Sequence, residues 1–261
     1  MNLIKNKQFR YSVYLSLLVL VPALLKVAYN NRSHIYFFEW SLPWLGIIIG
    51  LTLGRLDYGP YFTLKKKDEL PAIFLGILCF ILIGFFSHLG TLLSNTNDPQ
   101  GILHKVTSTP DFIDSVFNLP LVAMNEEFLK SLIALTLLKV LPFNRILNFI
   151  VSFLATIAFF GYIHTFFYPS TAFYPTMFSA IPTVLLFFLF RNIYPVIIGH
   201  YIADIISAIG HWSYFSDHRS QGIWIAMLLC FSSLLVYKFA ILAFSKIYKR
   251  LSKKTVSSYT A

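Results

Sequence analysis

Charged residues are scarce in this sequence, and their scarcity excludes an ordinary soluble domain. Asp, Glu, Lys and Arg make up 12% of the 261 residues, whereas soluble domains carry about 25%. Hydrophobic residues make up 57% and aromatic residues 18%, which is more than one soluble core could bury. The composition therefore predicts an all-α protein of the membrane, a polytopic helical bundle in contact with lipid.

Cysteine is nearly absent as well. Cys79 and Cys230 each stand in an apolar run, where a thiol behaves as a small buried hydrophobic group. Two such residues exclude a disulfide framework and do not indicate a thiol nucleophile. A small-residue cleavage site is also lacking after the first apolar stretch, so we expect residues 11–28 to be a retained span rather than a signal peptide.

Windows of roughly 20 apolar residues predict about eight transmembrane helices. Their approximate bounds are 11–28, 36–54, 71–93, 119–141, 145–168, 172–190, 193–214 and 222–245. We expect residues 94–118 to form a polar, exposed loop. The whole chain, 1–261, is interpreted as a single transmembrane domain, and the polar motifs described below fall within about 119–209.

Basic residues predict the orientation of these spans. They gather on one side of such a bundle: at the N-terminus, Lys65–Lys67, Lys139, Arg145, Arg191 and the C-terminal tail. Because cytoplasmic loops carry the excess of Lys and Arg, both termini are predicted to be cytoplasmic in a multi-pass protein of the cell membrane. The net charge of +10 therefore indicates orientation, and we expect no nucleic-acid partner.

The fourth apolar run contains three ionisable residues, Glu126, Glu127 and Lys130. Such residues inside a span are costly and are functional candidates for that reason. Glu126 and Lys130 are four residues apart, so we expect them to share a helix face and to pair. Glu127 then needs another partner or a water-filled cavity. The simpler interpretation is a structural ion pair that locks the bundle.

Two later runs add His164, and His200 followed by Asp204 at helical spacing. Together with Glu126 these groups could serve a metal-activated water, with zinc on the histidines and the glutamate as base. They could equally serve a carboxylate-activated water, with the imidazoles and Asp204 orienting the water or stabilising an oxyanion. The other histidines are given no role and are interpreted as interhelical hydrogen-bonding groups or loop residues: His34, His88, His104, His211 and His218.

The order of these motifs resembles a known family. Glu126-Glu127, Phe160-x-x-x-His164 and His200-x-x-x-Asp204 are similar to the three motifs of the CAAX-protease and bacteriocin-processing (CPBP, or Abi) family of intramembrane endopeptidases. Arg191, nine residues before His200, also resembles the family's approach to its third motif. The likeness covers Leu119 to Ile209.

The first motif departs from the family pattern. The family has Glu-Glu-x-x-x-Arg, whereas Ser131 occupies the arginine position here and Lys130 precedes it. Glu-Glu-x-x-Lys is instead similar to the first motif of the PrsW-type proteases. Lysine cannot give the bidentate pairing of arginine, so Glu127 could be held differently. The last two motifs favour the CAAX-protease branch.

The resemblance implies a role for each motif residue. Glu126 would activate water, His164 and His200 would assist, Asp204 would fill the position of the family's Asn or Asp, and Glu127 and Lys130 would support them. A glutamate-type mechanism requires no cofactor, whereas a metalloprotease mechanism would place zinc on His164 and His200. The implied substrate is a membrane protein or peptide, and the branch implies a bacterial source.

A second class of function uses the same residues without catalysis. Buried carboxylate and histidine chains also serve proton relays. The alternatives are a bacteriocin self-immunity factor, a scaffold or a proton-coupled transporter.

Overall fold

The structure is a computed structural model that describes residues 11, 58–62, 66–101, 107–233 and 236. Within these residues every regular element is a helix and no strand is present, which confirms the all-α prediction for this part of the chain. The elements are η3 (Gly59–Phe62), η4 (Lys66–Asp68), α3 (Glu69–Leu93), α4 (Thr109–Val140), α5 (Arg145–His164), η5 (Ser170–Ala172), α6 (Phe173–Phe190), α7 (Tyr194–His211) and α8 (Ser213–Asp217). Residues 219–233 are also helical.

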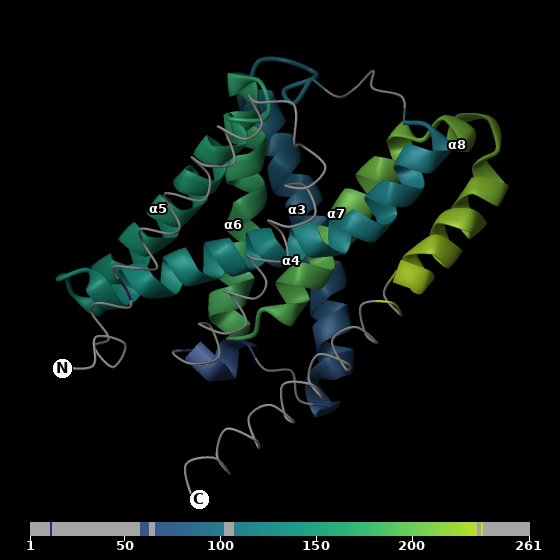
Figure 1. The fold of residues 1–261 in the computed structure, drawn as a ribbon. Helices are drawn as coiled ribbons and strands as arrows, with labels where there is room; N and C mark the ends of the chain where they lie inside the picture. Colours follow the sequence, from purple (N-terminus) through teal and green to yellow (C-terminus); the bar gives the residue numbers. More distant parts are fainter. Residues whose placement is uncertain (1–10, 12–57, 63–65, 102–106, 234–235, 237–261) are drawn as a thin grey trace, which may run out of the picture. The chain divides into compact units, whose positions relative to one another are not determined.

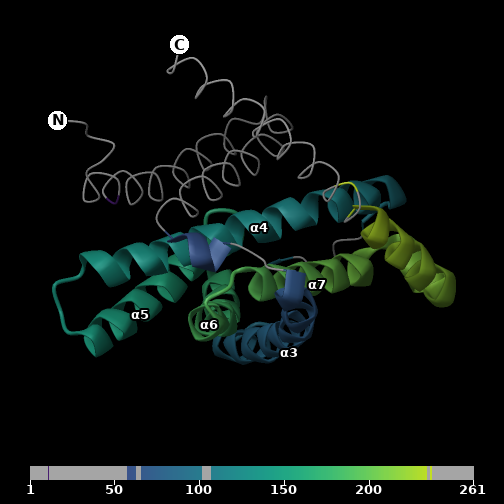
Figure 2. The same ribbon diagram turned by 90° about the horizontal axis from the view of Figure 1, so that it is seen from below.

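The described residues fall into two compact units. The first contains the residues up to 101 and 118–207, and the second contains 107–117 and 208–236. In the first unit α6 packs against α3 on one side and against α5 on another, and α4 crosses α6 and α7 (Figures 1 and 2). All the residues singled out from the polar motifs belong to this first unit.

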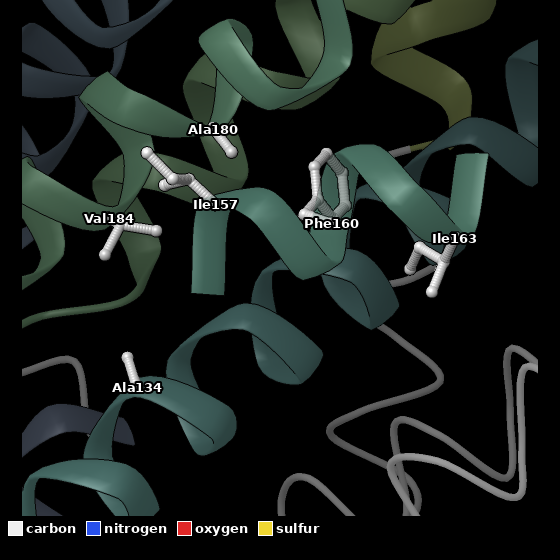
Figure 3. Packing of buried hydrophobic residues seen from close by; sticks show 6 residues of the cluster. All are labelled: Ala134, Ile157, Phe160, Ile163, Ala180 and Val184. Carbon is white, nitrogen blue, oxygen red and sulfur yellow. The ribbon is translucent and has the colours of Figure 1, made fainter. Parts of the chain in front are cut away.

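An apolar cluster joins three helices of the first unit. Figure 3 shows side chains of α4, α5 and α6 meeting in it: Ala134, Ile157, Phe160, Ile163, Ala180 and Val184. Burial of apolar side chains against one another fixes how these helices lie. Because Phe160 belongs both to this cluster and to the second polar motif, the core and the site share a side chain.

Close contact between α3 and α7 depends on glycine. A Cβ atom at Gly199 would lie 2.6 Å from the Cβ of Cys79 and 2.7 Å from the backbone oxygen of Gly76. No side chain larger than hydrogen fits there without moving a helix. Small residues allow membrane helices to approach closely in this way. Gly199 directly precedes His200, so this contact sets the depth at which the third motif lies.

The segment η3 packs between several helices. The Phe62 ring is fully buried and lies 5.6 Å from the Phe128 ring on α4. The backbone oxygen of Tyr61 accepts a 3.0 Å hydrogen bond from the N–H of Ile193, just before α7. These contacts hold the part of α4 that follows Glu127.

Helix α4 differs from its predicted bounds. It begins at Thr109, ten residues earlier than expected, and so occupies part of the predicted loop 94–118. The Ser108 hydroxyl donates to Asp111 Oδ2 at 2.6 Å and accepts from the Asp111 N–H at 3.3 Å. A serine side chain that accepts from an N–H in the first turn acts as an N-cap, which satisfies one of the first N–H groups of the helix. The acidic residues in the first turns hide this part of the helix from a search for apolar runs.

Among the residues that the structure describes, three helical segments are long and apolar enough to cross a membrane: Glu69–Leu93, Arg145–His164 and Ser170–Phe190. Long apolar side chains of the first stay exposed, including Phe74, Ile81 and Leu92, as a face in lipid requires. The predicted spans 11–28 and 36–54 lie outside the described residues, apart from Tyr11, and 222–245 lies partly outside them. Helices α4 and α7, which carry the charged motifs, are less apolar.

Candidate functional site

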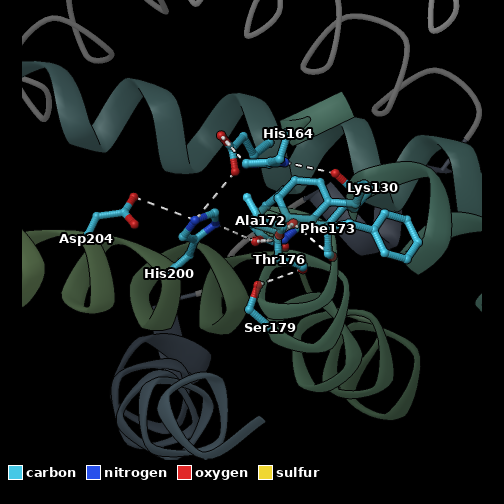
Figure 4. A network of polar contacts seen from close by, with 11 residues as sticks. Lys130, His164, Ala172, Phe173, Thr176, Ser179, His200 and Asp204 are labelled. Carbon is cyan, nitrogen blue, oxygen red and sulfur yellow. Dashed lines mark hydrogen bonds and ion pairs between the residues drawn. The ribbon is translucent and has the colours of Figure 1, made fainter. Parts of the chain in front are cut away.

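The four predicted catalytic residues come together in the first unit. Glu126 lies in the middle of α4, His164 is the last residue of α5, and His200 and Asp204 lie on α7. Figure 4 shows His164 and His200 beside α4, with Asp204 one turn further along α7. Three helices thus supply one cluster of acid and imidazole groups.

Glu126 lies between the two histidines. Its Oε1 atom is 3.8 Å from Nε2 of His164, and its Oε2 atom is 3.5 Å from Nε2 of His200. The Glu126 side chain is 23% exposed and those of the two histidines about 15%. These distances exceed a direct hydrogen bond, and separations of this kind are where a bridging water is expected. The carboxylate therefore faces a small polar space bordered by two Nε2 atoms.

The ring of His164 is fixed by its own helix. Its Nδ1 lies 2.8 Å from the backbone oxygen of Phe160, one turn earlier. A carbonyl oxygen only accepts, so Nδ1 carries the hydrogen, and in the neutral ring the lone pair is on Nε2. That lone pair faces Glu126. The Phe160 ring, 4.4 Å away between centroids, restricts the imidazole further.

The ring of His200 is surrounded by carboxylates. Its Nδ1 lies 2.7 Å from Oε1 of Glu127, and its Nε2 lies 3.6 Å from Oδ2 of Asp204 as well as near Glu126. Carboxylate oxygens only accept hydrogen bonds, so the ring donates from Nδ1 to Glu127, and its Nε2 faces two further acceptors. The two histidines therefore differ: His164 presents an acceptor to Glu126, and His200 presents a donor.

The predicted pairing of Glu126 with Lys130 is wrong. Lys130 Nζ instead lies 2.5 Å from Oε1 of Glu127, three residues earlier, and both side chains are almost fully buried. Residues three apart also share a helix face. The wholly buried carboxylate is the one that needs a cation most, because an unpaired buried charge is costly. Glu126 is left free to face the histidines.

Sequence reasoning missed the residues that bring the motifs together. Gly161 allows α6 to approach α5, because a Cβ there would lie 2.8 Å from the Cβ of Met177 and from the backbone oxygen of Phe173. Gly199 does the same for α7 and α3. The available signal was a glycine beside a motif residue in an apolar run, which indicates close helix contact.

The other histidines and Arg191 lie at other places in the described chain or outside the described residues. His88 is exposed on α3, and His218 stacks on Tyr214 in the second unit at 4.4 Å between ring centroids. Arg191 ends α6 in a left-handed conformation with φ 51° and lines a cavity of about 480 Å³ with Asp68 and Asn192. His211 ends α7, whereas His34 and His104 lie outside the described residues.

The donor set has the chemistry of a zinc site but not its spacing. A neutral imidazole whose Nδ1–H is held by an oxygen offers Nε2 to a metal, and both His164 and His200 have such an oxygen at Nδ1. Among the residues that the structure describes, however, no group of three His, Cys, Asp or Glu side chains is placed to hold a metal ion.

Comparisons of the chain with protein-family models, curated proteins and solved structures found no match. The likeness to CAAX-type and PrsW-type proteases rests on the three motifs and stays a prediction.

Proposed function

We propose that the protein is an intramembrane endopeptidase that hydrolyses a peptide bond in a membrane-associated protein or peptide. The observation that carries this proposal is the Glu126 carboxylate facing Nε2 of His164 at 3.8 Å and Nε2 of His200 at 3.5 Å. A base, an acceptor and a donor around one polar space are the parts that activation of water requires.

The geometry supports a division of labour. A water between Glu126 and His164 gives its proton to the carboxylate, and its oxygen attacks the substrate carbonyl carbon. The His200 N–H then stabilises the oxyanion of the tetrahedral intermediate. When the C–N bond breaks, Glu126 returns the proton to the leaving amine, so the carboxylate ends in its starting state. Asp204 and Glu127 hold the His200 ring in this orientation.

A zinc-dependent peptidase is the second form of this proposal. If a zinc ion were bound by His164 and His200, it would supply Lewis acidity toward the water and the carbonyl oxygen. Glu126 would still take the proton of the water. The two forms differ in whether a chelator removes the activity.

We further propose about eight transmembrane helices, with both termini in the cytoplasm of a bacterial cell. The three long apolar segments and the exposed apolar face of α3 support a membrane location. The distribution of Lys and Arg supports the orientation. In that topology the substrate reaches the site from the bilayer or its surface.

Replacement of Glu126, the proposed base, tests the peptidase function directly. Cells carrying Glu126→Gln should accumulate an uncleaved precursor that cells with the wild-type protein process, and comparative proteomics of membrane fractions would identify it. Purified protein in liposomes should then cleave that precursor, and Glu126→Gln should not. Glu69→Gln, an exposed acid at the start of α3, is the matched control and should cleave normally. Equal cleavage by wild type and Glu126→Gln would reject the proposal.

Proton-coupled transport is the second candidate, favoured by the carboxylates that flank His200 on both ring nitrogens. Such chains pass protons in membrane transporters. Liposomes containing the protein and a pH-sensitive dye would then acidify when a gradient is applied, and His200→Ala would abolish the flux. A scaffold or self-immunity factor would instead keep its cellular phenotype with Glu126, His164 and His200 all replaced by alanine.

A further inference from the structure

Phe160 contacts both halves of the site through different atoms. Its backbone oxygen accepts from Nδ1 of His164, and its ring lies beneath the Lys130 ammonium, 4.1 Å from Nζ to the ring centroid. The side chain is buried in the apolar cluster between α4, α5 and α6. Any residue at this position would supply the backbone oxygen, so the contact with Lys130 is the one that requires an aromatic ring.

The ring takes the place of water around a buried cation. Lys130 has an exposed side-chain fraction of 3%, and its acidic partner within the described part of the chain is Glu127, which is even less exposed. A buried ion pair stabilises a structure only when its remaining surface is also satisfied. The face of an aromatic ring attracts an ammonium group, most strongly where water is excluded. The Phe160 ring therefore gives the Lys130 ammonium a second favourable contact beside its ion pair with Glu127.

Lys130 is connected to His200 through the carboxylate of Glu127. Lys130 Nζ and Nδ1 of His200 both approach the same oxygen, Oε1 of Glu127, at 2.5 and 2.7 Å. A shift of the ammonium therefore moves or weakens the carboxylate that fixes the His200 ring. On the other side of Phe160, its own backbone fixes the His164 ring.

We propose that Phe160 is a positioning residue that sets both imidazoles against Glu126: His164 through its backbone oxygen, and His200 through its ring, Lys130 and Glu127. This inference rests on the proposed peptidase function for its catalytic consequence. The orientation of the two histidine rings can be measured without any substrate.

The test compares Phe160→Leu with Phe160→Tyr and with a matched control. Leucine keeps the side chain apolar but removes the aromatic face, whereas tyrosine keeps that face. Phe187→Leu is the control, because Phe187 is equally buried on α6 and its ring contacts are with Tyr61 and Phe188. We expect Phe160→Leu to lower kcat roughly tenfold with KM nearly unchanged, and Phe160→Tyr to restore most of it.

Ring signals provide the second readout. In ¹⁵N NMR of histidine-labelled protein in bilayers, Phe160→Leu and Lys130→Met should shift the His200 Nδ1 signal in the same direction, whereas Phe187→Leu should leave it in place. The variant that combines Phe160→Leu with Lys130→Met should show the same His200 Nδ1 shift as Lys130→Met alone. The reason is that the Phe160 ring acts on His200 through the Lys130 ammonium.

The outcomes separate the two proposals. A Phe160→Leu protein whose kcat and His200 signals match those of Phe187→Leu would overturn the positioning role even if the wild type is a protease. Additive, independent shifts in the double variant would overturn it too. If the wild type cleaves nothing, the peptidase proposal fails, and the NMR comparison still decides the role of Phe160.

Discussion

Oε1 of Glu127 lies 2.7 Å from Nδ1 of His200, and this contact joins α4 to α7 at the centre of the site. The same oxygen receives the Lys130 ammonium, so one buried carboxylate satisfies two cationic groups from different helices. Loss of its charge should therefore affect stability as well as chemistry.

Glu127→Gln should destabilise the protein by about 3–5 kcal/mol, because it leaves the buried Lys130 ammonium without its counter-charge. Thermal unfolding in detergent would measure this as a fall in Tm. Glu126→Gln should cost much less, since Glu126 is partly exposed and not paired with Lys130. Similar Tm values for Glu127→Gln and the exposed Glu69→Gln would contradict the burial argument.

Gly199→Ala should force α3 and α7 apart, because the added methyl group would overlap Cys79 and the backbone of Gly76. Overpacking of this kind costs about 1–3 kcal/mol, and the displaced His200 should lower activity as well. Gly210→Ala on the same helix is the control, since nothing lies within 4 Å of its added Cβ. It should be neutral or stabilising by up to about 1 kcal/mol. Equal Tm values for the two variants would argue against the close helix contact.

Ser108→Ala should fray the first turn of α4 by removing the hydroxyl that caps the Asp111 N–H. The expected cost is about 1 kcal/mol. Hydrogen exchange should accelerate at residues 109–112 and stay unchanged around Glu126. Ser216→Ala, which removes an exposed hydroxyl on α8, should leave that exchange pattern as it is. If residues 109–112 of Ser108→Ala exchange as slowly as those of the wild type, the Ser108 hydroxyl does not stabilise the first turn of α4.

Chelation distinguishes the two forms of the proposed mechanism. Because Glu126, His164 and His200 supply a base, an acceptor and a donor without an ion, cleavage by purified protein should survive prolonged treatment with a zinc chelator. Activity that is lost on chelation and restored by added zinc, but not by magnesium, would favour the zinc form.

Apolar runs predicted the described helices of the first unit to within a few residues, because α3, α5 and α6 are defined by hydrophobic length alone. They missed the start of α4, where Asp111 and Asp114 interrupt the apolar pattern and the N-cap Ser108 carries the signal instead. Spacing could not show that α4, α5 and α7 converge, because convergence depends on Gly161 and Gly199 at helix contacts far apart in the sequence.

Within the site, the sequence identified the ionisable residues but assigned one partner incorrectly. Positions i+3 and i+4 share a face, so Lys130 could have paired with either glutamate. Burial decided between them: Glu127 is enclosed by Lys130 and His200, whereas Glu126 turns toward the polar space. The role of Phe160 had no signal beyond its place four residues before His164.

The proposed function depends on the position of Glu126 between His164 and His200. This position can be measured without a substrate. Solid-state NMR of protein in bilayers, labelled with ¹³C-glutamate and ¹⁵N-histidine, would detect dipolar contacts between the Glu126 carboxyl carbon and both Nε2 nitrogens, with Glu126→Gln identifying the signal. We expect contacts to both rings. Contact with neither ring would contradict this arrangement.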